Sequence, residues 1–92
     1  MKILINRDYG GFGVKKEFVQ AVGLGDIYDD CIQVRTHPQL IEWVEQGINI
    51  GQTYSDLVVY EIPENATDYY IEEYDGFETL LCVLDGKIHK LT

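Results

Sequence analysis

The sequence predicts an α+β fold, a largely antiparallel sheet of five to six strands with two helices on one face. Apolar residues recur at helical spacing in residues 14–22 and 37–46, whereas β-rich or alternating segments fill most of the remainder. The predicted order is β-α-β-α followed by four strands, and strands that follow one another through short turns favour antiparallel pairing. The alternative is two small sheets, with the last hairpin packed apart from the first three strands.

The first half of the chain begins with a strand, a loop and a helix. Residues 2–6 are predicted to form a short strand, because an apolar run with Ile3 and Ile5 follows Lys2 and stops at Asn6. A glycine-rich loop at residues 9–13 follows it. Apolar residues at helical spacing predict a helix over residues 14–22, and Gly23 is a typical C-terminal stop.

A turn over residues 26–30, a second strand and a second helix are expected next. Residues 31–35 alternate in polarity and are predicted to form a strand. Thr36 is a good N-cap because Gln39, three residues on, completes a capping box, and Pro38 is tolerated in a first helical turn. This helix is expected to run to about Gln46, where Gly47 ends it, with one apolar face.

Four strands are predicted in the second half. Residues 57–62 are a β-rich run, and residues 69–74 form the next strand. The clearest local signal is a hairpin that joins residues 79–84 to residues 87–91 through Asp85-Gly86, a dipeptide typical of type I′ turns.

Length and composition predict one domain, residues 1–92, in the cytoplasm. The chain is 46 % hydrophobic, which is enough for a core. It has no run of 18 apolar residues that would span a membrane, and its start is too short for a signal-peptide core. Two cysteines are too few for a disulfide scaffold.

The charge is strongly acidic and uneven. Sixteen acidic residues face seven basic ones, a formal net charge of −9. Residues 1–25 carry four basic and two acidic side chains, whereas residues 56–78 carry eight acidic side chains and no Lys or Arg. Nucleic acid binding relies on cations that neutralise phosphates, so free nucleic acid and anionic membrane surfaces are poor partners. A protein with a basic surface is the partner that this charge favours.

The glycine-rich loop is the first candidate site. Backbone N–H groups before a helix N-terminus can hold an anion, and a lysine in the first turn adds positive charge. The loop lacks the full Walker A and dinucleotide patterns. Two interpretations stay open: a tight strand-to-helix turn, or a phosphate-binding site made by Tyr9, Gly10, Gly11, Phe12, Gly13 and Lys15.

Cys82 and His89 form the second candidate. The two-residue turn predicts that Leu84 pairs with Lys87, Val83 with Ile88, and Cys82 with His89. A thiol beside an imidazole can form an activated nucleophile or supply two metal ligands. A catalytic nucleophile, however, needs a third, orienting group, and structural zinc needs four ligands. We therefore expect no enzyme, no metal and no cofactor.

The third candidate is an acidic, tyrosine-rich segment, residues 69–78. It is a solvated face that keeps the domain soluble, or a recognition surface that occupies a basic groove, since charge steers association and tyrosine supplies binding energy. The residues assigned to a partner site are Asp68, Tyr70, Glu72, Glu73, Tyr74, Asp75 and Glu78.

Three blocks of sequence together resemble a family of small acidic proteins encoded by bacteriophages: residues 5–14, residues 35–45, and residues 59–63 followed by residues 71–76. Members open with Ile-Asn-x-x-Tyr-Gly-Gly-Phe-Gly-Leu and carry a late Glu-Tyr-Asp-Gly, and the resemblance covers most of this chain. The family has no assigned activity, so the resemblance implies a phage origin and no catalytic residue. Relatives have a small hydroxyl residue soon after the loop where this chain has Lys15.

Charge and resemblance lead to one functional hypothesis. A phage accessory protein in the host cytosol would bind and inhibit or redirect a host protein, such as a nucleic-acid-handling defence factor of the type that anti-CRISPR proteins block, with residues 56–78 as a nucleic-acid mimic. The alternative is a module that holds a phosphate-bearing metabolite or a signalling nucleotide at the glycine loop. A homodimer is compatible with edge strands and exposed aromatic residues.

Overall fold

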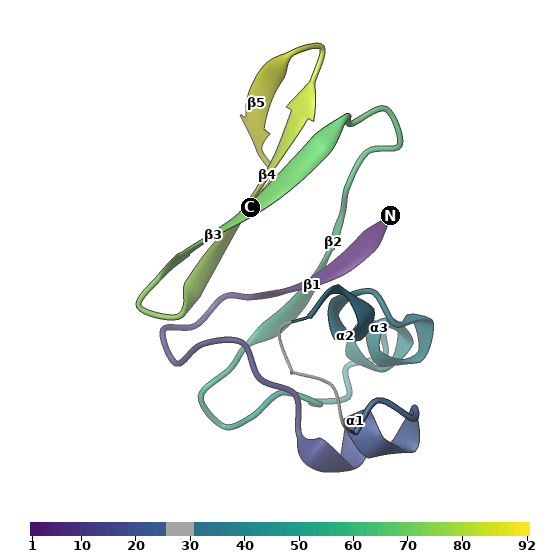
Figure 1. The fold of residues 1–92 in the computed structure, drawn as a ribbon. Coiled ribbons are helices and arrows are strands. Elements are labelled where there is room, and N and C mark those ends of the chain that lie inside the picture. The colour runs from purple at the N-terminus through teal and green to yellow at the C-terminus, as the bar shows by residue number, and fades with distance from the viewer. Residues whose placement is uncertain (26–30) are drawn as a thin grey trace.

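The computed structural model describes residues 1–25 and 31–92 and confirms the α+β class. Its elements, drawn in Figure 1, are listed here in chain order: β1 (Lys2–Asn6), α1 (Lys16–Ala21), α2 (Ile32–Arg35), α3 (Pro38–Glu45), β2 (Leu57–Glu61), β3 (Asp68–Tyr74), β4 (Phe77–Leu84) and β5 (Lys87–Lys90). The predicted turn at residues 26–30 lies outside the described residues.

The single sheet of five to six strands is wrong, because the strands form two antiparallel sheets. β1 pairs with β2, and β3, β4 and β5 form a second sheet in that order. The two-sheet alternative is closer, because the last hairpin does lie in a sheet apart from β1 and β2, and the structure adds β3 to that sheet. The reason is local: Asp75 and Gly76 both have positive φ and make a two-residue turn that pairs β3 with β4.

The two sheets and the helices form three layers (Figure 1). Alternate residues of β1 serve two cores: Leu4 packs with the helices, whereas Ile3 and Ile5 pack against the inner face of the three-stranded sheet. The helical core contains Leu4, Val14, Val19, Val34, Leu40, Ile41 and Ile50. The core between the sheets contains Ile3, Ile5, Ile62, Leu80 and Cys82. The predicted helices on one face hold for the β1–β2 sheet.

The strand predicted over residues 31–35 is wrong, because this segment is the single helical turn α2. Val34 and Arg35 are neighbours in sequence and both are buried. A strand would send these two side chains to opposite faces, whereas a helical turn can direct both inward. The Thr36 hydroxyl donates a 2.6 Å hydrogen bond to the Ile32 carbonyl and closes the turn.

The helix ends differ from the predictions by one or two residues. α3 is capped by His37 instead of Thr36, since the His37 Nδ1 accepts a 3.2 Å hydrogen bond from the Gln39 N–H. α1 begins only at Lys16, because the two residues before it make contacts outside the helix. Val14 forms a β-bridge with Gly51, and the Lys15 N–H donates a hydrogen bond to the Ile50 carbonyl. The register of the last hairpin is confirmed at all three predicted pairs.

Candidate functional site

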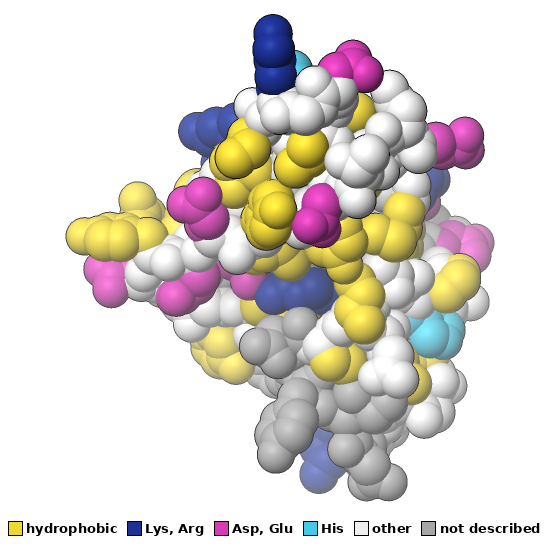
Figure 2. Space-filling view, turned by 45° about the horizontal axis from the view of Figure 1, so that its top comes forward, with side chains coloured by type: hydrophobic (Ala, Val, Ile, Leu, Met, Phe, Trp, Pro, Cys, Tyr) yellow, Lys and Arg dark blue, Asp and Glu magenta, His cyan; other side chains and the backbone are white. Residues whose placement is uncertain are grey.

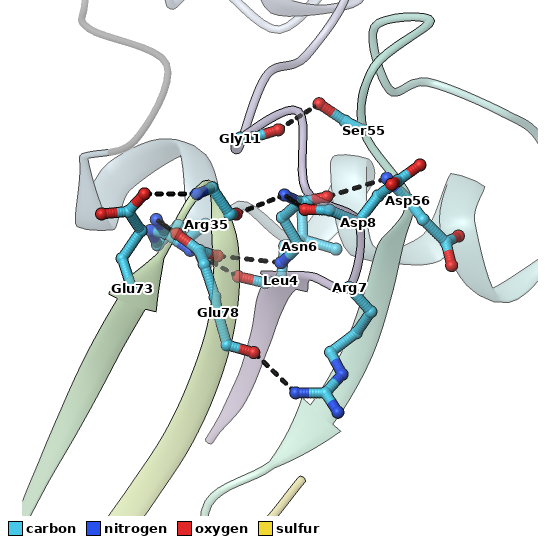
Figure 3. A network of polar contacts seen from close by, with 11 residues as sticks. Leu4, Asn6, Arg7, Asp8, Gly11, Arg35, Ser55, Asp56, Glu73 and Glu78 are labelled. Atoms are coloured by element: carbon cyan, nitrogen blue, oxygen red, sulfur yellow. Dashed lines mark hydrogen bonds and ion pairs between the residues drawn. The ribbon is translucent and has the colours of Figure 1, made fainter.

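A buried ion pair joins the helical layer to the three-stranded sheet. Arg35 ends α2 and Glu78 lies near the start of β4, and they are only 5 % and 4 % exposed. Two parallel hydrogen bonds link them: Arg35 Nη1 donates to Glu78 Oε1 over 2.8 Å, and Nη2 donates to Oε2 over 2.6 Å. Arg35 also donates to the Leu4 carbonyl of β1 over 3.0 Å. The pair therefore contacts all three layers (Figure 3).

Asn6 completes this network at the end of β1. Its backbone N–H donates to Glu78 Oε1 over 2.8 Å, and its side-chain amide donates to the Gly76 carbonyl over 2.7 Å. The Asp56 N–H donates to the Asn6 side-chain oxygen over 2.8 Å. Asn6 thus ties β1 to the start of β2 and to the β3–β4 turn (Figure 3). No buried side-chain nitrogen or oxygen of the described residues lacks a partner.

Aromatic rings pack against both arginines of this region. The Arg35 guanidinium lies 4.0 Å from the centre of the Phe12 ring, and the Arg7 guanidinium lies 4.2 Å from the centre of the Phe77 ring. Tyr9 stacks on Phe77 with ring centres 5.1 Å apart. The polar side chains of this network bond to one another and to the backbone. The network is therefore a polar core that holds the three layers together.

The structure brings the glycine-rich loop against the β3–β4 turn. A Cβ built on Gly76 would overlap the Gly11 nitrogen and the Tyr9 carbonyl oxygen, and a Cβ on Gly10 would overlap Tyr54. Gly11 has a φ of 98°, a conformation that favours glycine. Close packing and backbone conformation therefore account for the glycines at these positions.

The remaining loop residues also have structural contacts. A Cβ on Gly13 would come within 2.8 Å of the Tyr54 hydroxyl. The Lys15 ammonium donates to the Asn49 carbonyl over 3.3 Å, and its backbone N–H donates to Ile50 over 2.8 Å. α1 has only six residues and no side-chain cap. Within the described residues, these contacts favour the tight-turn interpretation over a phosphate site.

The seven residues of the predicted partner site separate into three groups. Asp68, Tyr70, Glu72 and Tyr74 alternate along β3 and share one exposed face. Glu73 is exposed on the other side of the strand, and its carboxylate accepts a hydrogen bond from the Gly76 N–H, while Asp75 lies in the turn. Glu78 is the buried partner of Arg35, so its carboxylate is not exposed to another protein.

We call the side of the three-stranded sheet that faces away from β1 and β2 the outer face. Strand register places on it Asp68, Tyr70, Glu72 and Tyr74 of β3, Phe77, Thr79, Leu81 and Val83 of β4, and Ile88 and Lys90 of β5. Tyr74 is 75 % exposed, Ile88 67 % and Tyr70 48 %. Figure 2 shows hydrophobic and acidic side chains interleaved over this part of the molecule.

The outer face contains apolar residues that the sequence-based site lacked. Leu81 lies opposite Tyr70, Val83 is its neighbour on the same face of β4, and the predicted hairpin register already pairs Val83 with Ile88. Sequence reasoning also missed the buried pair of Arg35 and Glu78. The available signal was the alternation of β4, which places Glu78 on the same face as the buried Leu80 and Cys82.

Cys82 and His89 are cross-strand neighbours, as the two-residue turn at Asp85-Gly86 predicts. Cys82 is fully buried in the core between the sheets, whereas His89 is exposed. Among the residues that the structure describes, no group of three or more His, Cys, Asp or Glu side chains could hold a metal ion.

One ionisation at the outer face is shifted. A hydrogen bond from the Tyr70 hydroxyl to Asp68, together with the negative charge of that carboxylate, raises the pKa of Tyr70 above its ordinary value.

Comparisons with known proteins give no match: no family model, no curated protein and no solved structure is significantly similar to this chain. None of the helices in the described parts of the chain has the length and apolar character needed to cross a membrane.

Proposed function

We propose that this chain is a phage-encoded accessory protein that binds a basic protein of its host and inhibits or redirects it. The observation that supports this most is the uncovered outer face, where Asp68 and Glu72 alternate with Tyr70 and Tyr74 along β3. Exposed tyrosines supply binding energy at protein interfaces, and carboxylates between them select a basic partner and accelerate its approach.

The distribution of the cations supports a protein partner over nucleic acid. Arg35 is buried, and the Lys2 ammonium pairs with Glu45 over 2.7 Å. Lysines 15 and 16 lie at α1 and lysines 87 and 90 lie on β5, so they belong to different parts of the fold. A duplex would meet a surface dominated by acidic groups at a net charge of −9.

We infer that the partner is a host factor that handles nucleic acid, such as a defence nuclease, because proteins of this class expose basic grooves for phosphates. Carboxylates on the outer face would compete for such a groove. The chain has no role in catalysis in this proposal.

Charge reversal at the outer face tests the proposal. The variant Asp68→Lys/Glu72→Lys and the control Glu17→Lys/Glu42→Lys change the net charge by the same amount, and all four positions are exposed. Tagged proteins are incubated with host lysate at low and high salt, and retained proteins are identified by mass spectrometry. We expect the unmodified chain and the control to retain the same basic protein at low salt, and less of it at high salt.

The outer-face variant should lose that protein at both salt concentrations. Equal retention by the outer-face variant and the control would contradict the proposal, as would a retained protein whose binding ignores both salt and charge reversal. Circular dichroism of each variant confirms that the fold is intact before retention is compared.

A further inference from the structure

The layer order leaves one sheet face without a covering layer. The β1–β2 sheet packs against the helices on one side and against the three-stranded sheet on the other. On the outer face of the three-stranded sheet, Tyr9 and Arg7 cover Phe77 at one end. The rest of that face has no such cover within the described residues, although it carries a strip of apolar side chains. Apolar sheet faces in folded proteins are normally buried against a second layer of helices or strands.

This apolar strip crosses the three strands diagonally. Leu81 lies opposite Tyr70, and Val83 lies opposite Ile88, so the four side chains are cross-strand neighbours. Leu81 and Val83 are half-buried by these neighbours, while Ile88 and Tyr70 project further into solvent. Neighbouring exposed apolar side chains on one face are a feature of interaction sites.

Charges border the strip asymmetrically. Asp68 and Glu72 stand along β3, and Lys90 stands on β5 at the opposite edge. With the chain at a net charge of −9, a second copy is repelled as a whole, whereas a partner with basic residues along one flank is attracted to the β3 side.

We propose that the outer face docks one amphipathic helix of a partner protein, with its apolar stripe over Tyr70, Leu81 and Val83 and its basic flank along Asp68 and Glu72. The inference rests on the proposed function and defines the element of the partner that is bound. β3 has seven residues and spans about 23 Å at roughly 3.3 Å per residue, which matches a helix of about 15 residues. Helix-on-sheet packing supplies the missing layer.

The probe is a synthetic 16-residue peptide with leucines at helical i, i+3, i+4 and i+7 spacing and lysines along one flank. A peptide of identical composition with the leucines scattered is the control for charge. Amide chemical shifts of the isotope-labelled chain are followed by NMR during titration with each peptide. We expect shifts confined to the outer face and binding of the amphipathic peptide at least about tenfold tighter than that of the scattered peptide.

Matched substitutions separate the strip from other exposed apolar residues. Tyr70→Thr/Ile88→Thr removes two side chains of the strip, whereas Ile32→Thr/Ile48→Thr removes two that are exposed to 45 % and 41 % on other parts of the fold. The first variant should bind the amphipathic peptide about tenfold more weakly. The second should bind it as the unmodified chain does.

Three results would overturn the inference. They are equal binding of both peptides, equal weakening in the two variants, or shifts centred on acidic positions away from the outer face. A dimer in light scattering whose formation is lost in Tyr70→Thr/Ile88→Thr would assign the face to a second copy instead. If the peptide fails while retention of a host protein still depends on Asp68 and Glu72, the proposed function stands and the helix inference alone is wrong.

Discussion

Removal of one charge from the pair of Arg35 and Glu78 is expected to destabilise the whole fold. Both side chains are almost fully buried, so Glu78→Gln leaves the guanidinium without its compensating carboxylate. Breaking a buried pair in this way costs about 3–5 kcal/mol. We expect the lower part of that range for Glu78→Gln, because the glutamine oxygen can still accept the hydrogen bond from the Asn6 N–H.

Arg35→Met should cost more, toward about 5 kcal/mol, because it also removes the hydrogen bond to the Leu4 carbonyl and the contact with the Phe12 ring. A loss of about 3 kcal/mol would lower the Tm by roughly 12–24 °C in a domain of this size. Total stability is about 5–14 kcal/mol for 92 residues, so either substitution removes a large part of it.

Urea unfolding followed by tryptophan fluorescence measures both variants and Arg35→Met/Glu78→Gln. The double variant should cost less than the sum of the singles, by about 1–3 kcal/mol, because both single substitutions remove the same interaction between Arg35 and Glu78. Glu45→Gln is the control, since it breaks the exposed pair with Lys2 and should leave the unfolding midpoint unchanged. Strictly additive losses, or losses as small as that of the control, would show that the pair of Arg35 and Glu78 does not stabilise the fold in this way.

Two further predictions concern the β3–β4 hairpin. Gly76→Ala should destabilise the chain more than Gly86→Ala, because both glycines have positive φ but only at Gly76 would the added Cβ overlap the glycine loop; equal changes in Tm would contradict this. The pKa of Tyr70 should lie above its usual value of about 10 and fall in Asp68→Asn, as measured by NMR titration of its ring; an unchanged value would remove the assigned cause. Because that pKa is raised on folding, the associated stability is present at neutral pH and is lost as the pH rises through the shifted value.

Local signals predicted the parts of this fold that neighbouring residues determine. The Asp85-Gly86 turn gave the register of the last hairpin, and the Gly47 stop gave the end of α3 within two residues. The same dipeptide at Asp75-Gly76 carries the signal that joins β3 to β4. That turn was not used to divide the sheets, and the single-sheet prediction followed from leaving it out.

The remaining features depend on contacts between distant residues. Arg35 meets a carboxylate 43 residues away, and the segment that ends with Arg35 forms one helical turn despite its strand-like alternation. The acidic segment appeared uniform in sequence, yet the structure buries Glu78 and uses Glu73 in the turn. Only the alternation of β3 and β4, combined with the two-residue turns, shows which of these side chains share the outer face.

Site-specific photo-crosslinking tests the partner surface most directly. A benzophenone amino acid is placed at Tyr70 on the outer face or, as the control, at Ile48, which is exposed to a similar degree in the loop after α3. After irradiation in host lysate, crosslinked proteins are identified by mass spectrometry. If the outer face binds the partner, one basic host protein is crosslinked from position 70 and is absent from position 48. The same protein crosslinked equally from both positions, or from position 48 alone, would contradict it.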